Sequence, residues 1–351
     1  MTTRTQTSKI MVGSVPVGGG SPVTVQSMCN TKTADVAATL AQLRRLRAAG
    51  CDIIRLAVPD ADAAAALPAL CEGAGMPVVA DIHFDYRLAI AAAEAGVAAV
   101  RINPGNIGAG DKVRAVAEAC AGRGIPIRIG VNSGSCERAL LARYGGPTPE
   151  ALVESAAGEI EALHRCGFDN IALSVKASNA VDTVAAYRLA AERFTCPLHV
   201  GVTEAGPGQS GLIYSAVGIG TLLMEGIGDT IRVSLTADPA EEVRAGLQLL
   251  KAAGLRREGV RIISCPTCGR TNIDLIALAR AAQERFEGLS KNLTIAVMGC
   301  EVNGPGEAAE ADCGLAGGRG FGSLFAHGRV IKTKIPEERL LDELAALVET
   351  L

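Results

Sequence analysis

The sequence predicts an α/β protein, a (β/α)8 TIM-type barrel over residues 1–254 followed by a smaller α+β domain over residues 260–351. The main observation is that eight short segments rich in Val and Ile alternate with Ala-rich helical segments between residues 20 and 250. The chain also shows no dinucleotide fingerprint, which disfavours a doubly wound sheet. Several helical segments end in Gly just before the next strand, as expected of a helix C-cap: Gly50, Gly96, Gly124 and Gly167.

The predicted barrel strands are short runs in which β-branched residues dominate. They cover Val23–Met28, Ile53–Val58, Val78–His83, Ala99–Asn103, Ile127–Asn132, Ile171–Lys176, Leu198–Thr203 and Thr230–Leu235. The helices between them include Ala34–Ala49, Asp85–Ala95, Asp111–Arg123, Pro149–Cys166 and Val181–Arg193, and the last barrel helix covers Pro239–Ala253. A polar segment flanked by glycines, Gly254–Gly259, is predicted to link the two domains.

The second domain has the pattern of a small mixed unit. We expect strands at 260–264 and 293–298, a helix at 271–284, and a hairpin formed by 323–325 and 329–334. Pro336 opens the expected final helix, whose first turn carries Glu337 and Glu338 where the helix dipole favours negative charge.

Composition excludes several classes of function. The formal net charge is −3 with dispersed Lys and Arg, so no basic patch indicates a nucleic acid or membrane partner. Eleven cysteines, an odd number scattered through hydrophobic segments, favour a reducing compartment over a disulfide framework. Residues 1–20 lack the apolar core of a signal peptide, and no later segment is apolar over a membrane-spanning length. We therefore expect a cytoplasmic protein.

The second domain carries a candidate metal site. Cys265 and Cys268 are two residues apart, and the segment 299–307 supplies Cys300 and Glu307 in a Gly- and Pro-rich turn. Thiolates bind zinc or an iron–sulfur cluster. With Cys313 as fourth ligand the site would be a structural zinc site; without it, three thiolates and a weaker carboxylate suit a cubane cluster with one replaceable ligand. The surroundings of Cys313 resemble the interior of a small strand, which favours the cluster.

Polar side chains collect at the carboxyl ends of the predicted barrel strands, where barrel active sites lie. Five cations recur around the ring and outnumber the carboxylates there, although any single one could equally form an internal ion pair. Because unpaired buried charge is costly, the set predicts a bound anion such as a diphosphate. The predicted substrate-binding residues are Arg55, Asp81, Arg101, Asn103, Arg128, Asn132, Lys176, Arg232 and Ser234, with Asn303 from the second domain.

Two further residues at the strand ends are candidates for catalysis. Glu204 follows strand seven and is the predicted proton-handling or hydroxyl-positioning group. His83, next to Asp81, is a weaker candidate for the same work, whereas His199 lies too early in its strand and is expected to be structural. The Gly- and Pro-containing segment 102–108 could cradle phosphate with its backbone amides, although a plain turn is the simpler interpretation.

These motifs together resemble the 4-hydroxy-3-methylbut-2-en-1-yl diphosphate synthase family of iron–sulfur enzymes, in its compact bacterial form. The resemblance runs from about residue 5 to the C-terminus and rests on Val25–Met28, Asp81–Phe84, Ile102–Gly108, Val202–Gly206, Cys265–Arg270 and Gly299–Ala308. It implies a [4Fe–4S] cluster held by Cys265, Cys268, Cys300 and Glu307. It also implies reductive ring opening of 2-C-methyl-D-erythritol 2,4-cyclodiphosphate with electrons from flavodoxin or ferredoxin.

The resemblance extends to the substrate site and the assembly. It implies a diphosphate held by Arg55, Arg101, Arg128 and Lys176, with further contacts from Asn132, Glu204 and Ser234. It also implies a homodimer in which the cluster domain of one subunit caps the barrel of the other. Two rival interpretations remain at this stage: a barrel lyase or synthase for a phosphorylated substrate with a structural zinc domain, and an iron–sulfur electron carrier without catalysis.

Overall fold

The structure is a computed structural model that describes residues 1–108, 110–301 and 310–351. The chain divides into two compact units, Met1–Arg256 and Arg257–Leu351. Among the described residues, no helix combines the length and the apolar character that a membrane crossing requires.

The first unit is the predicted parallel barrel, and its fold class is confirmed. Hydrogen bonding joins eight parallel strands in the order β8-β7-β6-β5-β4-β3-β10-β9. An isolated parallel bridge between Leu173 and Leu198 brings the two ends of this sheet together and closes the ring. The strands are β3 (Thr24–Met28), β4 (Ile53–Ala57), β5 (Val78–Asp81), β6 (Ala99–Ile102), β7 (Ile127–Asn132), β8 (Ile171–Lys176), β9 (His199–Val200) and β10 (Thr230–Ile231).

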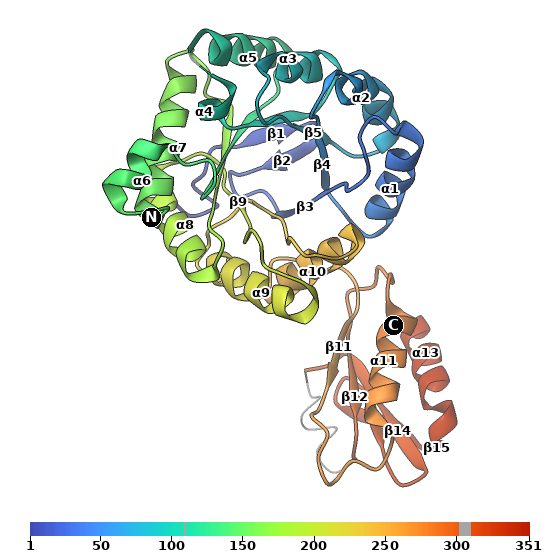
Figure 1. Ribbon diagram of the computed structural model, residues 1–351. Coiled ribbons are helices and arrows are strands. Elements are labelled where there is room, and N and C mark those ends of the chain that lie inside the picture. The colour runs from blue at the N-terminus through green and yellow to red at the C-terminus, as the bar shows by residue number, and fades with distance from the viewer. Residues whose placement is uncertain (109, 302–309) are drawn as a thin grey trace. The chain divides into compact units, whose positions relative to one another are not determined.

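Helices surround these strands, as Figure 1 shows. They are α1 (Val36–Ala48), α2 (Ala61–Ala74), α3 (Tyr86–Glu94), α4 (Pro104–Ile107), α5 (Gly110–Arg123), α6 (Arg138–Tyr144), α7 (Pro149–His164), α8 (Ala180–Arg193), α9 (Gly208–Met224) and α10 (Pro239–Ala252). Many begin at a side chain that accepts a hydrogen bond from the first turn, which fixes where each helix starts. These N-caps are Asp35, Asp60, Asp85, Thr148, Asn179 and Asp238. The four predicted glycine caps all have positive φ, between 66° and 92°.

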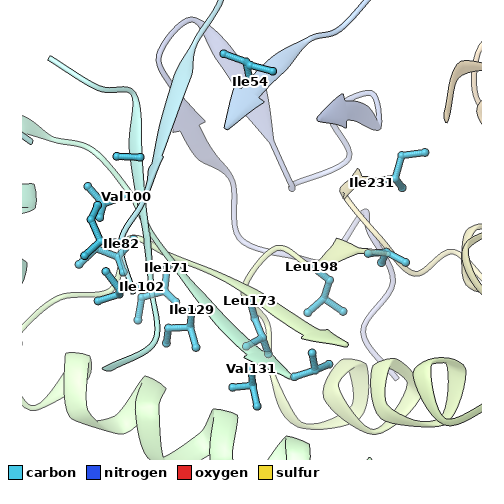
Figure 2. Packing of buried hydrophobic residues seen from close by; sticks show 14 of the residues in the cluster. Ile54, Ile82, Val100, Ile102, Ile129, Val131, Ile171, Leu173, Leu198 and Ile231 are labelled. Atoms are coloured by element: carbon cyan, nitrogen blue, oxygen red, sulfur yellow. The ribbon is translucent and has the colours of Figure 1, made fainter. Parts of the chain in front are cut away.

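Alternation along the strands separates a hydrophobic shell from the barrel interior. Figure 2 shows the outward-facing set, in which Ile54, Val100, Ile129, Leu173 and Ile231 belong to one buried cluster between strands and helices. The residues next to these in sequence point the other way, because side chains of a strand alternate between its two faces. The cations of the predicted site occupy these inward positions.

An N-terminal hairpin, which was not predicted, covers one end of the barrel. Strands β1 (Ile10–Val12) and β2 (Val15–Val17) pair antiparallel. Their apolar residues form one cluster with inward residues at the start of the barrel strands, namely Ile53, Val79, Ala99 and Ala172. The hairpin therefore closes the amino-terminal end of the barrel, and the polar inward residues further along the strands face the other end.

Three expectations for the barrel were wrong in detail. Strand seven, expected at 198–203, is reduced to β9, and strand eight, expected at 230–235, is reduced to β10. Within β9, the carbonyl of His199 accepts a hydrogen bond from the buried hydroxyl of Tyr187 of α8. Beyond β10, the N–H of Leu235 donates to a side chain. The segment expected as a turn after β6 contains the short helix α4.

The second unit contains a five-stranded sheet of order β11-β12-β13-β14-β15. Its strands are β11 (Arg261–Ser264), β12 (Thr294–Met298), β13 (Cys313–Gly317), β14 (Phe321–Ala326) and β15 (Arg329–Pro336). Helices α11 (Leu275–Phe286) and α13 (Leu340–Thr350) bury their apolar faces in its core. The expected hairpin is confirmed as β14 and β15. The helix expected from residue 271 begins at Leu275, and the turn after Pro336 is a 3-10 helix, Glu337–Arg339.

Candidate functional site

The barrel brings the five predicted cations into one interior. Register pairs Asp81 of β5 with Arg101 of β6, and Arg101 in turn with Arg128 of β7. At the end of β8, Lys176 lies opposite Asn132 of β7. Register thus gathers residues that lie far apart in the sequence.

Asp81 is the carboxylate around which part of this set is organised. It is 2% exposed, and its Oδ1 accepts from Arg101 Nη1 at 3.0 Å. Its Oδ2 lies 3.6 Å from Arg55 Nε and 3.4 Å from His83 Nε2. Burial by itself raises the pKa of Asp81, but Arg55, His83 and Arg101 outweigh burial and hold it well below its usual range. Asp81 is therefore ionised and orients two of the predicted substrate-binding arginines.

Two glycines make room for the long cationic side chains. A Cβ at Gly130 would overlap Nε of Arg101, and a Cβ at Gly201 would lie 2.6 Å from the backbone carbonyl oxygen of Arg232 and 2.7 Å from Nζ of Lys176. Because Cβ atoms essentially never approach a heavy atom so closely, any larger residue would push the cation aside. Arg101 Nη2 also donates to the carbonyl of Gly130 at 3.0 Å. The glycines therefore belong to the site although they carry no functional group.

Arg128 and Lys176 also belong to the interior, and neither has a carboxylate in hydrogen-bond contact within the part of the chain that the structure describes. Arg128 is 6% exposed, its Nη1 donates to Gln26 Oε1 at 2.6 Å, and its Nη2 has no partner among the described residues. Burial, with Arg55 and Arg101, lowers the pKa of Arg128 well below its ordinary value. Burial, with Arg232 and Arg55, does the same for the pKa of Lys176. Both groups gain from an anionic ligand, which would replace the lost hydration.

A carboxylate that the sequence did not reveal lies beside the fifth cation. Glu242 of α10 is 5% exposed, and its Oε2 lies 3.7 Å from Nη2 of Arg232. It escaped prediction because it belongs to a helix, where an acidic residue in the first turn is ordinarily a surface group. With all of these groups ionised, five cations and the carboxylates of Asp81 and Glu242 leave a net charge of +3. The predicted excess of cations therefore persists once the buried carboxylates are counted.

The other predicted barrel residues differ in how free they are to bind a ligand. Asn103 is 2% exposed, and both polar atoms of its side chain lack partners among the described residues. Asn132 is engaged locally, because its Oδ1 accepts the N–H of Gly134 at 3.1 Å. Ser234 is half-buried in the segment after β10. Glu204 is exposed and has φ of 54°, a left-handed conformation that costs a non-glycine residue about 1–2 kcal/mol. Such strain is common at functional sites.

The predicted structural role of His199 agrees with its environment. The ring is 1% exposed and its Nδ1 lies 3.4 Å from Thr230 Oγ1. Burial lowers the pKa of His199 well below its ordinary value, and Arg128 and Lys176 lower it further. A neutral imidazole inside the barrel adds no charge to the cationic set.

In the second unit, the three predicted cysteine ligands follow two neighbouring strands. Strands β11 and β12 are parallel, and Cys265 and Cys300 come after their carboxyl ends. The N–H of Gly299 donates to Cys265 Sγ at 3.3 Å, and this contact ties the two segments together. The backbone N–H of Arg270 lowers the pKa of the Cys268 thiol, and the charge of Arg270 lowers it further.

The metal site itself is only partly covered by the described residues. Within residues 1–108, 110–301 and 310–351, no three His, Cys, Asp or Glu side chains are grouped closely enough to hold a metal ion. The predicted ligand Glu307 and the predicted substrate contact Asn303 lie outside the described residues. Nucleophilic thiolates, an N–H directed at sulfur and a thiol of lowered pKa nevertheless fit the chemistry of an iron–sulfur ligand set.

Cys313 lies away from this place, as the sequence predicted. It is completely buried in the core of the second unit, and burial raises the pKa of its thiol to about 11. Its register partner on β12 is Ile295, five positions before Cys300. At ~3.3 Å per strand residue this separates them by roughly 16 Å along the sheet, too far for one metal. The four-thiolate zinc site therefore loses its fourth ligand.

Comparison with protein families matches both units. The model described as "GcpE TIM-barrel domain" matches residues 7–247, and that described as "GcpE protein C-terminal domain" matches residues 261–350. A curated relative from Geobacter sulfurreducens, named 4-hydroxy-3-methylbut-2-en-1-yl diphosphate synthase (flavodoxin), is 56% identical over 99% of this chain and 98% of its own. The chain belongs to the 4-hydroxy-3-methylbut-2-en-1-yl diphosphate synthase family.

Other relatives agree with this family of enzymes. A protein of the same name from Clostridium perfringens is 55% identical over 99% of each chain. Among solved structures, a truncated 3-deoxy-D-arabino-heptulosonate 7-phosphate synthase from Thermotoga maritima matches 71% of this chain and 94% of its own, with a TM-score of 0.50 and 16% identity. That likeness concerns the barrel fold alone. Membership in the synthase family confirms the resemblance that the sequence motifs indicated.

Proposed function

We propose that this enzyme catalyses the reductive ring opening and dehydration of 2-C-methyl-D-erythritol 2,4-cyclodiphosphate to 4-hydroxy-3-methylbut-2-enyl diphosphate. Two electrons and two protons enter and one water leaves, so that atoms and charge balance. The observation that carries the proposal is the barrel interior, where five cations lie together and their ion pairs, among the described residues, involve the two carboxylates of Asp81 and Glu242. A diphosphate neutralises this excess, and the names of the curated relatives specify the same product.

The diphosphate is held by the buried cations. Arg128 Nη2, which has no partner among the described residues, and Lys176 are the groups that gain most from an anion. Asp81 keeps Arg55 and Arg101 oriented, so these two guanidinium groups need little reorganisation when substrate binds. The diphosphate stays attached to the product, and the pocket therefore serves to hold and orient the reacting carbons.

Around this anion site we assign Asn103, Asn132, Ser234, Arg232 and the second-domain residue Asn303 as further substrate contacts. Glu204, exposed at the end of the short seventh strand, is the proton-handling or hydroxyl-positioning group. His83, whose Nε2 lies 3.4 Å from Asp81 Oδ2, is the second candidate for that role.

For the cofactor we propose a [4Fe–4S] cluster held by Cys265, Cys268, Cys300 and Glu307. When bound, such a cluster supplies electrons and a Lewis-acidic iron. The N–H of Gly299 on Cys265 Sγ and the lowered pKa of the Cys268 thiol support this ligand set. A carboxylate as fourth ligand leaves one iron more exchangeable than a thiolate would.

The proposal includes the partners and the compartment. Flavodoxin, named in the curated relatives, or ferredoxin delivers the electrons one at a time. The chain assembles as a homodimer in the cytoplasm. All eleven cysteines are described and none forms a disulfide, which supports a reducing compartment. On α9 the apolar residues Ile213, Tyr214 and Val217 are more than half exposed, which supports burial of that helix against another chain.

The decisive experiment is anaerobic reconstitution with iron and sulfide, followed by turnover of the cyclic diphosphate with a chemical reductant. We expect a brown protein with broad visible absorbance and reductant-dependent product formation. A colourless protein that retains only zinc would indicate instead a barrel lyase with a structural zinc unit. A coloured protein without turnover would indicate an electron carrier.

Two variants test the assigned residues. Glu307→Ala is expected to lower cluster content or activity, and unchanged values of both would remove Glu307 from the ligand set. Arg128→Ala is expected to weaken substrate binding with the colour retained. Loss of the cluster in Arg128→Ala would contradict its role as a substrate contact.

A further inference from the structure

Glu242 of α10 contacts two further elements of the barrel, the segment after β10 and strand β3. Its Oε1 accepts the backbone N–H of Leu235 at 2.9 Å, which anchors the segment after β10 to α10. Its Oε2 lies 3.7 Å from Arg232 Nη2 and 3.5 Å from the hydroxyl of Ser27 on β3. The segment 232–235, which also contains Ser234, therefore contacts the Glu242 carboxylate through both its first and its last residue.

Arg232 depends on this carboxylate for its orientation. Its backbone N–H donates to the carbonyl of Val200 at 2.9 Å, so the main chain is fixed at one side of the residue. Its side chain is 17% exposed, and its buried Nε has no partner within the described residues. Glu242 is the carboxylate paired with its guanidinium group. The contact leaves Nε–H available to a ligand.

We propose that Glu242 is a positioning residue for the anion site: it holds Arg232 and the segment 232–235 in the conformation that binds the diphosphate. This inference rests on the proposed function for the identity of the anion. Arg232 is the contact residue and Glu242 acts through it. The carboxylate also costs the pocket one unit of positive charge, so its presence there requires a compensating role.

The two effects of Glu242 on anion binding have opposite signs, which makes the proposal testable. As a bare negative charge, Glu242 repels an anion, and its neutralisation would tighten binding. As a positioning group it organises a charge-assisted contact, and its loss would weaken binding roughly ten-fold. The substitution Glu242→Gln keeps the size of the side chain and an oxygen that can accept the Leu235 N–H, but it removes the ion pair.

The experiment is a double-mutant cycle on the full-length, reconstituted protein with inorganic pyrophosphate as the probe. Affinities are measured by calorimetry at an ionic strength of about 0.15 M, where exposed charges are screened, for the wild type, Glu242→Gln, Arg232→Met and the double variant. We expect Glu242→Gln to bind pyrophosphate about ten-fold more weakly in the presence of Arg232. In the Arg232→Met background the carboxylate is only repulsive, so the same substitution should tighten binding.

Glu241→Gln is the matched control, because Glu241 is exposed and occupies the same first turn of α10. It should leave pyrophosphate affinity within about two-fold of the wild type, because the effect of an exposed charge is screened. Circular dichroism and thermal unfolding establish that each variant is folded. An unfolded Glu242→Gln would be replaced by Glu242→Asp, which keeps the charge but shortens its reach and should also weaken binding.

Tighter pyrophosphate binding by Glu242→Gln, or an equal weakening with and without Arg232, would overturn the inference. Turnover of the cyclic diphosphate by the wild type is measured separately. If the variants show the expected sign reversal with pyrophosphate but the wild type does not convert the cyclic diphosphate, the proposed function is refuted and the role of Glu242 is supported.

Discussion

Replacing Asp81 by Asn is the most direct test of the electrostatic organisation of the barrel. The carboxylate is 2% exposed and contacts Arg101 at 3.0 Å, Arg55 at 3.6 Å and His83 at 3.4 Å. An Asn side chain keeps the shape but leaves both arginines without the charge of Asp81. Removing one partner of a buried ion pair costs about 3–5 kcal/mol.

This cost should appear in the thermal unfolding of the barrel. For a unit of some 250 residues, about 2–4 °C is lost per kcal/mol, so we expect Asp81→Asn to lower the midpoint by roughly 10 °C. The variant also loses the carboxylate that orients Arg55 and Arg101 for the anion. Because a ligand that binds only the folded state stabilises it in proportion to its affinity, added pyrophosphate should raise the midpoint less in Asp81→Asn than in the wild type.

Scanning calorimetry at pH 7, with and without pyrophosphate, measures both effects. The control is Glu161→Gln, which breaks an exposed pair with Arg165 of 3.1 Å and should cost less than about 0.5 kcal/mol. The reasoning would be refuted if Asp81→Asn unfolded within about 2 °C of the wild type, or if pyrophosphate stabilised Asp81→Asn more strongly than the wild type.

Three further predictions concern the anion site and the cluster. Burial and neighbouring arginines lower the pKa of Lys176, so we expect Lys176 to take up as much as one proton when pyrophosphate binds. Calorimetry in buffers of different ionisation enthalpy measures this proton uptake. The affinity for pyrophosphate should fall as the pH rises above the lowered pKa of Lys176. Gly130→Ala should weaken pyrophosphate binding and cost about 1–3 kcal/mol of stability, whereas Gly158→Ala on α7, where a Cβ meets nothing within 4 Å, should not destabilise. Cys313→Ala should keep its iron and sulfide after reconstitution, while Cys300→Ala should lose them.

Each of these predictions has an outcome that contradicts it. Proton uptake that persists in Lys176→Met would assign the proton to another group. Equal pyrophosphate affinity in Gly130→Ala and the wild type would show that the arginine beside Gly130 can move without loss. Loss of iron in a folded Cys313→Ala would restore Cys313 to the ligand set.

Much of the barrel was predictable because its signals are local. Alternating β-branched and Ala-rich segments, with glycine at the helix ends, fix the element types whatever the neighbours are. The lengths of the last two strands were not predictable, and in this part of the barrel side chains from other elements bond to the backbone: Tyr187 of α8 donates to the carbonyl of His199, and Glu242 of α10 accepts the N–H of Leu235. Hydrogen bonds between elements that are distant in the sequence produce no repeating residue pattern from which they could be predicted.

The same division holds for the candidate site. The cations and Asp81 were predictable, because the carboxyl end of every barrel strand lies at the active-site face and a charged residue there contrasts with the apolar residues around it in the sequence. Glu242 was not, because an acidic residue in the first turn of a helix is ordinary. Nor could the sequence show that Gly130 and Gly201 make room for cations, since a close approach exists only between folded strands.

For this protein, the order of residues alone determined the family, the barrel and the cysteine motif, because these depend on motifs and on periodicity along the chain. Tertiary structure decided which charges meet. It placed Asp81 between two arginines, Glu242 beside a third, and Cys313 in a hydrophobic core away from the other cysteines. The reason is physical: the free energy of a buried charge or thiol depends on its distance from other groups and on its exposure to water. Both quantities are set only when the chain folds.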